Sequence, residues 1–220
     1  MSHRAKVLMK EFVTHNVTRF IIERPQGYSF VPGHYALLSI DKDGLREDMH
    51  PFTFTSLPGD EVLEFTIKIY PEHHGLTEKL DGLESGDILL LTDHRGSIEY
   101  GGPGMFIAGG AGITPFIAIL RDLRDRGKLE GNAVFFSNRT HADIMLEREL
   151  QNMLKDDCIF SLTDERREGY LNHRIDADFL KQRITDFSQR FYVCGPPKMV
   201  EDITSALKEL GAEPDAIVFD

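Results

Sequence analysis

The sequence predicts two folds in succession: an N-terminal antiparallel β-barrel and a C-terminal doubly wound parallel α/β sheet. Short β-rich segments separated by turn signals continue to residue 92, and many short strands of this kind are typical of a closed barrel. Strands then alternate with helices, which predicts a parallel sheet with helices on both faces. The pattern changes at the Gly-Gly-Pro-Gly of residues 101–104, which we interpret as an inter-domain hinge. The expected domains are residues 1–101 and 102–220.

Alternating or β-rich segments define the barrel strands. We expect strands at residues 6–14, 17–23, 35–40, 52–55, 62–70 and 87–92. Turn residues separate them, among them Pro25 and Gly27 in an early turn and Pro58 and Gly59 in a later one. Only residues 75–83 have a helical pattern, so one helix is expected in the barrel domain.

The second half alternates apolar strands with amphipathic helices. Apolar residues at 113, 116, 117, 120 and 123 follow the spacing of one helical face. We expect strands at 105–108, 133–137, 158–162, 191–194 and 216–219, and helices at 113–123, 142–154, 176–184 and 197–210.

Composition excludes several classes of protein. A formal charge of −11 argues against nucleic acid, which is held by basic contacts to phosphate. No apolar run approaches the roughly 18 residues of a membrane span, and the start lacks the apolar segment of a secretory signal, so we expect a cytoplasmic protein. Cys158 and Cys194 are too few for an iron–sulfur cluster, and neither a metal site nor a disulfide is expected. Any electron carrier is therefore organic or lies on another chain.

The strongest motif is the glycine-rich turn Gly109–Pro115. An apolar strand runs through it directly into an amphipathic helix. Glycine allows a pyrophosphate to approach the backbone, and the helix N-terminus offers unpaired N–H groups. Pro115 suits the first helical turn but stands where the common dinucleotide pattern has a third glycine. The alternative is a purely structural turn.

A second strand–turn–helix junction runs through Cys194, Gly195 and Pro196. The carboxyl end of a parallel strand is where ligands bind, which would place Cys194 at the crevice. The alternative is that Cys194 is a small buried apolar residue.

Two further motifs lie in the barrel. In the segment His50-Pro51-Phe52-Thr53, Thr53 would bond to the polar edge of a heterocycle and Phe52 would cover its face. The segment Gly75-Leu76-Thr77 opens the expected helix and is a second candidate phosphate site. In the alternative, Thr77 is an N-cap and the preceding histidines form a solvated loop.

In this order and spacing, the four motifs resemble the ferredoxin–NADP reductase superfamily across essentially the whole chain. The resemblance implies a FAD-binding barrel followed by an NAD(P)-binding domain, with no fused iron–sulfur domain. The family's flavin strand carries Arg-x-Tyr-Ser/Thr where this chain has His50-Pro51-Phe52-Thr53. By resemblance Phe52 packs on the isoalloxazine, Thr53 bonds near its N5 and His50 lies by the FAD phosphates. A histidine is only partly charged near neutral pH, so this departure bears on FAD affinity.

The resemblance also implies the rest of the site. Gly75, Leu76 and Thr77 match the family's pyrophosphate segment with one residue fewer, and residues 136–146 match the adenosine-ribose segment of the NADH-cytochrome reductase branch. The full expected cofactor-binding set is His50, Pro51, Phe52, Thr53, Ile67, Lys68, Ile69, Gly75, Leu76, Thr77, Gly110, Gly112, Ile113, Thr114, Pro115, Ser137, Arg139, Cys194, Gly195, Pro196 and Phe219.

Cofactor preference stays open at Ser137 and Arg139. They either bind the 2′-phosphate of NADPH, or Arg139 pairs with Asp143 four residues on. NADH and NADPH therefore both stay open as the nicotinamide cofactor.

The implied reaction is hydride transfer from nicotinamide C4 to flavin N5, followed by release of electrons to a separate carrier such as a ferredoxin or flavodoxin. Thr53 is expected to orient N5 and Cys194 to shape the site near C4, so these two are the expected catalytic residues. One alternative is the reductase component of a multicomponent oxygenase, or a flavin or ferric reductase. An alternative of another class is a non-catalytic dinucleotide-binding redox sensor. The sequence decides neither the acceptor nor the oligomeric state.

Overall fold

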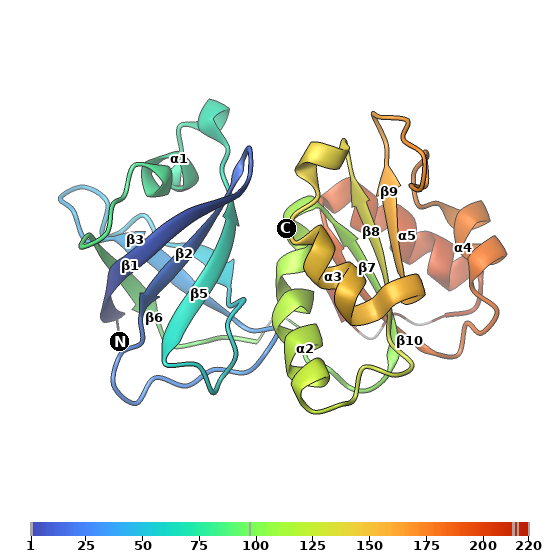
Figure 1. Cartoon of the computed structure of the whole chain (residues 1–220), viewed down its shortest axis with the longest axis horizontal. Coiled ribbons are helices and arrows are strands. Elements are labelled where there is room, and N and C mark those ends of the chain that lie inside the picture. The colour runs from blue at the N-terminus through green and yellow to red at the C-terminus, as the bar shows by residue number, and fades with distance from the viewer. Residues whose placement is uncertain (1, 97, 213, 215, 220) are drawn as a thin grey trace.

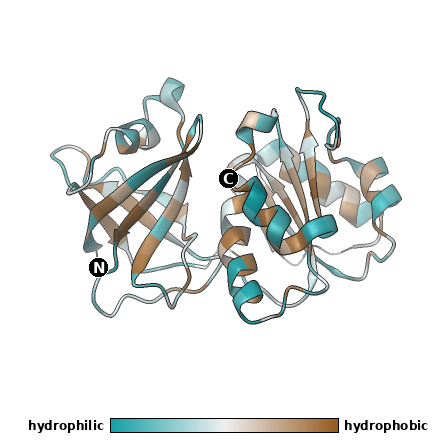
Figure 2. Cartoon of the chain, in the orientation of Figure 1, coloured by the Kyte–Doolittle hydropathy of each residue, from teal (hydrophilic) through white to brown (hydrophobic). Residues whose placement is uncertain are grey.

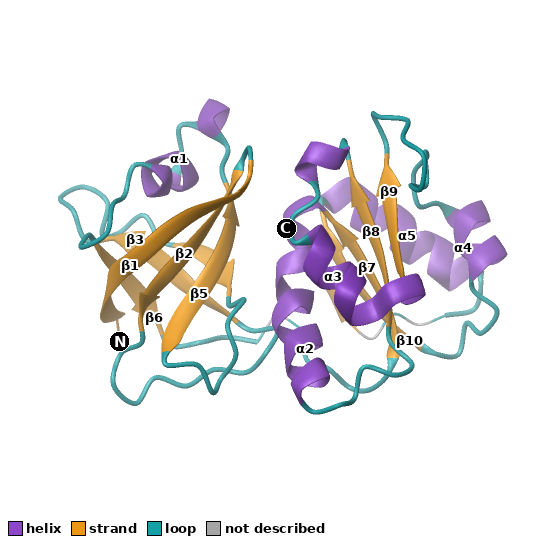
Figure 3. Ribbon diagram, viewed as in Figure 1, coloured by secondary structure: helices purple, strands orange, loops and turns teal. Residues whose placement is uncertain are grey.

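Two separate sheets divide the chain, one in each half (Figure 1). The computed structural model describes all residues except 1, 97, 213, 215 and 220, and in the last strand it describes the side chain of Ile217 alone. The first sheet curls into a barrel with one short helix above it, and the second is covered by helices (Figure 3). The predicted fold class is confirmed.

The barrel sheet is antiparallel, with strand order β4-β3-β6-β1-β2-β5. Its strands are β1 (Ser2–Thr14), β2 (Val17–Glu23), β3 (Tyr35–Ile40), β4 (His50–Thr53), β5 (Val62–Lys68) and β6 (Ile88–Thr92). Just beyond β4 the chain bridges to β5 at Phe54 and Phe65, and the Thr55 N–H donates to the Glu64 carbonyl at 2.8 Å. This bridge closes the sheet into a barrel.

Alternate residues of the strands fill the barrel with apolar side chains. Phe20, Phe54 and Phe65 are fully buried there, and the Phe54 ring stacks on Phe30 with 4.3 Å between centroids. The period of two along each strand therefore sends one set of side chains inward. The helical segments beside the barrel are η1 (Pro71–His73) and α1 (Leu76–Asp81).

The second sheet is parallel, with strand order β11-β10-β7-β8-β9. Its strands are β7 (Gly104–Gly109), β8 (Ala133–Asn138), β9 (Cys158–Leu162), β10 (Arg190–Gly195) and β11 (Ala216–Phe219). Its helices are η2 (Gly110–Ile113), α2 (Thr114–Asp125), η3 (His141–Asp143), α3 (Glu147–Leu154), η4 (Lys155–Asp157), α4 (Ala177–Arg183) and α5 (Pro197–Glu209). The strand order reverses at β7, where ligands of open α/β sheets bind.

Two apolar clusters cover the two faces of this sheet. Residues of α2 and α3 pack with Phe106, Phe136 and their neighbours on one face, and residues of α4 and α5 pack with Ile107 and Phe191 on the other. Figure 2 shows the apolar strands between helices whose outer surfaces are hydrophilic. Among the described residues, no helix is both long and apolar enough to cross a membrane.

The barrel meets the second sheet through α2. Val17 of the barrel and Ile98 of the connecting segment belong to the same buried cluster as Ile119. Gly33 also packs tightly against this cluster, since a Cβ there would stand 2.9 Å from Cδ1 of Ile119 and 2.4 Å from the Ile98 carbonyl oxygen. The helix that leaves the glycine-rich turn therefore also forms the contact between the two halves.

Most helix and strand boundaries differ from the sequence-based expectation by a few residues, and two of the differences bear on the site segments. The expected helix at 142–154 is interrupted, because Leu146 takes the left-handed conformation (φ 54°) between η3 and α3. The strand expected at 52–55 begins at His50 and ends at Thr53.

The expected hinge at residues 101–104 is held against β10. A Cβ on Gly104 would lie 2.3 Å from the Arg190 carbonyl oxygen, and the Tyr192 hydroxyl donates to the Gly102 carbonyl at 2.8 Å. The segment between the two halves is therefore packed onto the second sheet.

Candidate functional site

A cavity of about 350 Å³ opens at the carboxyl ends of the central parallel strands. Gly109 ends β7, Asn138 ends β8, Thr163 follows β9 and Pro196 follows β10. The lining residues are Lys68, Gly109, Gly110, Ser137, Asn138, Arg139, Asp143, Thr163, Arg174, Ile175, Pro196, Lys198, Met199 and Asp202. This position beside the strand-order reversal is the one expected for a dinucleotide.

The glycines of the turn after β7 have two different roles. A Cβ on Gly112 would lie 2.4 Å from the Cys194 carbonyl oxygen, and one on Gly109 would lie 2.3 Å from the Met199 sulfur. Gly112 is therefore required for close packing because it faces backbone, whereas a Cβ on Gly109 would displace the flexible side chain of Met199. Gly110, by contrast, has φ +53° and lines the cavity, and a Cβ there would meet no described atom within 4 Å. The turn thus leaves bare backbone open to the cavity at the start of η2, as phosphate binding requires.

Asn138 has the unsatisfied polar groups expected of a ligand-binding residue. Its side chain is 5% exposed and lines the cavity, and neither Oδ1 nor Nδ2 has a hydrogen-bond partner among the described residues. A buried unsatisfied polar group costs about 1–3 kcal/mol, so a polar ligand that bonds to this amide removes the penalty. Asn138 lies in the expected adenosine-ribose segment 136–146 but was not predicted individually, although its place at the end of a parallel strand is a signal that could have found it.

The cavity is more basic than the chain as a whole. Four basic and two acidic side chains line it, in a protein of formal charge −11. Arg139 pairs with Asp164 at 2.8 Å, and Asp143 instead caps η3 through Thr140. The alternative in which Arg139 pairs with Asp143 is therefore wrong, because its carboxylate partner is Asp164. Arg139 remains at the rim with Arg174, where a phosphate would be attracted.

The barrel contributes to the same cavity. Lys68, the last residue of β5, lies among the lining residues with Gly110 and Asn138. Ile67 and Ile69, which were expected to line the flavin, are 3% and 6% exposed in the barrel core. Strand alternation explains the difference, because neighbours of an outward-facing lysine point inward.

Cys194 lies behind the cavity wall. Its side chain is 3% exposed in the core that contains α2, and its carbonyl packs against Gly112. Gly195, with φ +157°, approaches the backbone of Gly109, and Pro196 reaches the cavity. The structure thus joins the two strand–turn–helix motifs into one wall. The side chain of Phe219 lies outside the described residues.

The strand β4 lies at one end of the strand order of the barrel sheet. Thr53 and Phe52 pair with Tyr35 and Ala36 of β3 on one side. Phe52 and Thr53 are half-buried, whereas the two residues before them are exposed. Phe52 also packs partly on the barrel core. An aromatic face and a hydroxyl are therefore accessible on one strand, which fits a planar polar heterocycle.

Polar contacts join the start of β4 to α1. His50 Nε2 lies 2.9 Å from Oδ1 of Asp48, and Lys79 donates to the other oxygen of Asp48 at 3.4 Å. The hydrogen bond with His50 is the main cause that holds the pKa of Asp48 below its usual range. The start of the expected flavin strand is therefore tied to the helix of the barrel domain.

The start of α1 does not follow the alternative in which Thr77 is the N-cap. Gly75, not Thr77, is the N-cap of α1. The Thr77 hydroxyl instead accepts from the Tyr70 N–H at 3.3 Å, which ties the helix to the chain that leaves β5. Because Lys79 of this helix reaches Asp48 beside His50, the segment and His50 share one end of the barrel.

Each half of the chain matches the model of a known domain family. The FAD-binding domain family matches residues 2–87, and the oxidoreductase NAD-binding domain family matches residues 106–205. The two matches fall on the barrel and on the parallel sheet, respectively.

Several characterised proteins are similar in sequence over nearly the whole chain. The reductase component of the naphthalene 1,2-dioxygenase system of Pseudomonas putida is 24% identical over 99% of this chain and 68% of its own length. The propane 2-monooxygenase reductase component of Rhodococcus jostii is 30% identical, over 99% of this chain and 62% of its own length. NADH–cytochrome b5 reductase 1 of Arabidopsis thaliana is 28% identical, over 96% and 80%. The chain thus spans about two thirds of the two oxygenase reductases.

Solved structures share the fold. A ferredoxin NADP+ reductase from Neisseria gonorrhoeae with bound FAD and NADP superposes with a TM-score of 0.85 at 19% identity, covering 100% of this chain and 98% of that one. The cytochrome b5 reductase domain of Ulva prolifera nitrate reductase gives 0.83 at 22% identity, covering 100% and 97%. With its FAD-binding and NAD-binding domains in this order, the chain belongs to the ferredoxin–NADP reductase superfamily of oxidoreductases.

Proposed function

We propose that this protein is an NAD(P)H-dependent flavoprotein reductase that passes electrons to a separate acceptor. The observation that carries the proposal is the shared cavity: Gly110 and Asn138, whose amide has no partner among the described residues, line it together with Lys68 of the FAD-binding barrel. A dinucleotide held there contacts both halves. When bound, FAD accepts a hydride from the nicotinamide and releases the electrons one at a time.

The nucleotide is assigned to the turn Gly109–Pro115 and its neighbours. Gly110 offers bare backbone to a pyrophosphate, while the buried residues 112–115 hold the turn in place from the inner side. Asn138 bonds a ribose hydroxyl or phosphate oxygen through its open amide. The segment Cys194–Pro196 shapes the wall that faces the nicotinamide.

FAD is assigned to the outer strand of the barrel sheet. Phe52 covers the face of the ring system and Thr53 bonds its polar edge, since both are accessible on β4. His50 and the segment Gly75–Thr77 hold the phosphates, because contacts through Asp48 keep these two segments together.

The names of the relatives support a separate electron carrier. Two of them are named as reductase components of oxygenase systems and one as a cytochrome b5 reductase. A carrier such as a ferredoxin, a flavodoxin or an oxygenase component is therefore the proposed acceptor.

The test is anaerobic reduction of the purified, FAD-loaded protein by NADH and by NADPH in separate titrations. Bleaching of the flavin absorbance by either nucleotide is the expected result, and reoxidation by added carrier proteins then identifies the acceptor. A protein whose flavin is reduced by dithionite but by neither nucleotide is a binding protein or sensor, and the proposal fails.

A further inference from the structure

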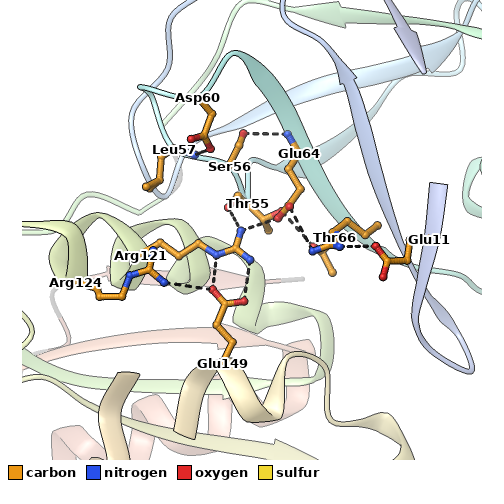
Figure 4. A network of polar contacts seen from close by, with 11 residues as sticks. Glu11, Thr55, Ser56, Leu57, Asp60, Glu64, Thr66, Arg121, Arg124 and Glu149 are labelled. Carbon is orange, nitrogen blue, oxygen red and sulfur yellow. Dashed lines mark hydrogen bonds and ion pairs between the residues drawn. The ribbon is translucent and has the colours of Figure 1, made fainter. Parts of the chain in front are cut away.

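A buried ion-pair network crosses from the barrel to α2 (Figure 4). The guanidinium of Arg121 donates to the Thr55 carbonyl at 2.5 Å and to Oε1 of Glu64 at 2.6 Å, both in the barrel. It also binds both oxygens of Glu149 on α3, at 2.6 and 2.9 Å. The side chains of Arg121 and Glu64 are only 12% and 11% exposed. One cation therefore holds a carboxylate from each half of the protein.

The partners of Arg121 are themselves fixed. The Thr55 hydroxyl donates to Oε1 of Glu64 at 2.8 Å, and the Glu64 N–H donates to the Ser56 hydroxyl at 2.9 Å. Burial alone would raise the pKa of Glu149, but the hydrogen bonds and charge of Arg121 lower it below its usual range. The network is thus charged and held at several points, and such bidentate contacts fix orientation as well as distance.

The network joins the two segments that carry the proposed cofactor sites. Thr55 follows Thr53, the proposed flavin-binding residue, by two positions. Arg121 lies on α2, about two turns after Thr114, which belongs to the nucleotide-binding turn. The helix that leaves the nucleotide-binding turn and the segment that follows the flavin strand are therefore linked directly.

The other contacts between the halves are less directional. The buried cluster of Ile119, Val17 and Ile98 is apolar, and apolar contacts resist sliding less than a bidentate ion pair does. His15 lies at 3.3 Å from the Ala142 carbonyl and at 3.8 Å from an oxygen of Asp143, but its side chain is 57% exposed to solvent. The network of Arg121 is therefore the contact best suited to fix the distance between the halves.

We propose that Arg121 is a positioning residue for hydride transfer, which holds the flavin strand and the nicotinamide-binding turn at reacting distance. The inference rests on the proposed function. Hydride donor and acceptor must approach to about 3–3.5 Å, and a misplacement of about 1 Å lowers the rate up to about 100-fold. Arg121 is not one of the residues that line the cavity. It acts through Thr55 on one side and through α2 on the other.

The test compares Arg121→Lys with Arg124→Lys in the FAD-loaded protein. Lysine keeps the charge but loses the planar fork that binds Thr55, Glu64 and Glu149 together. Arg124 is the matched control, because it lies on the same helix, is 45% exposed and reaches the network only at Glu149, at 4.0 Å. Anaerobic stopped-flow reduction separates the limiting rate of flavin reduction from the dissociation constant of the nucleotide.

We expect Arg121→Lys to lower the limiting rate about tenfold or more while FAD stays bound and Arg124→Lys matches the wild type. We also expect weaker long-wavelength absorbance of the reduced flavin with NAD+, which reports contact of the rings, and faster hydrogen exchange at the Thr55 amide. If Arg121→Lys does not fold, Glu64→Gln is measured in its place, because it keeps the shape of the side chain and removes its charge.

Equal limiting rates and equal exchange in the Arg121 and Arg124 variants overturn the inference, as does the same result for Glu64→Gln. A rate loss that only follows loss of FAD or a lower Tm also overturns it, since that indicates a structural role alone. If the wild type itself is not reduced by either nucleotide, the proposed function fails. If the nucleotide reduces the wild type and the variants have the same limiting rate and exchange as the wild type, the positioning role is rejected and the proposed function stands.

Discussion

Gly112 packs against the end of β10 so closely that a Cβ on it would stand 2.4 Å from the Cys194 carbonyl oxygen. The glycine-rich turn and the Cys194–Pro196 segment consequently form one packed unit, although they lie far apart in the sequence. Changes at either segment should therefore affect the other.

We expect Gly112→Ala to destabilise the protein by about 1–3 kcal/mol, the usual range for overpacking a tight core. The added methyl group would push the turn away from β10, so nucleotide binding should weaken as well. Denaturant unfolding measures the first effect. Gly59→Ala is the control, because a Cβ there would meet no described atom within 4 Å. Equal stability of the two variants would contradict the packing role of Gly112.

Comparing Gly110→Ala with Gly127→Ala distinguishes the effect of backbone strain from that of lost contact with the nucleotide. Gly110 and Gly127 both have positive φ, +53° and +66°, and in the described structure neither has an atom within 4 Å of a built Cβ. Each alanine should therefore cost a similar amount, about 1–2 kcal/mol, in unfolding free energy. Only Gly110 of the two lines the cavity, so only its variant should bind NAD(P)H more weakly in a titration. Equal affinities would remove Gly110 from the binding site.

Asn138→Leu should have opposite effects on stability and binding. Leucine has a similar size and removes two buried polar atoms that lack partners within the described chain, so the free energy of unfolding should stay level or rise. The dissociation constant of the nucleotide should rise about tenfold, the equivalent of about 1.4 kcal/mol. The exposed Asn152→Leu is the control. A variant that is less stable but binds normally would show that Asn138 is structural.

Thr53→Ala should slow reduction of the flavin by NAD(P)H while FAD stays bound. The proposed role of Thr53 is one hydrogen bond to the polar edge of the ring, whereas the phosphates and the ring face are held by other residues. Thr53→Ser keeps the hydroxyl and should retain most of the rate. Stopped-flow absorbance gives both rates, and an alanine variant as fast as the wild type would remove Thr53 from the mechanism.

Acid should loosen the contact between the halves. Burial opposes the charge of Glu149, but Arg121 lowers the pKa of this carboxyl below its ordinary value of 4.5. A lowered pKa contributes stability that is present above pH 4.5 and is lost as the pH falls through the folded-state pKa. Glu149→Gln should flatten this part of the profile of stability against pH, and the exposed Glu201→Gln should leave it unchanged. If stability depends on pH in the same way in both variants, Glu149 is not the group responsible for the acid effect.

Local patterns were sufficient to predict most of the fold. The strands Val17–Glu23, Tyr35–Ile40 and Cys158–Leu162 have the predicted bounds, because alternation or a short apolar run between turn residues identifies them. The break at Leu146 was missed, since a left-handed leucine has no local sequence signal. The conformation of such a residue is set by its surroundings in the fold.

The glycine-rich turn and the ends of the parallel strands predicted where the cavity lies. The ion pairs were not predicted, because they join segments that are distant in the sequence. Arg139 pairs with Asp164, 25 residues on, and Arg121 pairs with Glu64, 57 residues back, and with Glu149, 28 residues on. None of these separations follows a helical or strand period, so only the assembled fold brings these charges together. The side chains of Ile67 and Ile69 lie in the barrel core, and the sequence did not predict this because the direction in which side chains alternate depends on how the barrel closes.

Pro51 has a consequence for the protein before its flavin is bound. It stands in β4, which ends the strand order of the barrel sheet, and it is exposed. A strand in this position can template pairing with another chain, and a proline there offers no N–H to such a partner. We therefore expect Pro51 to limit such pairing along the strand to which we assign the flavin.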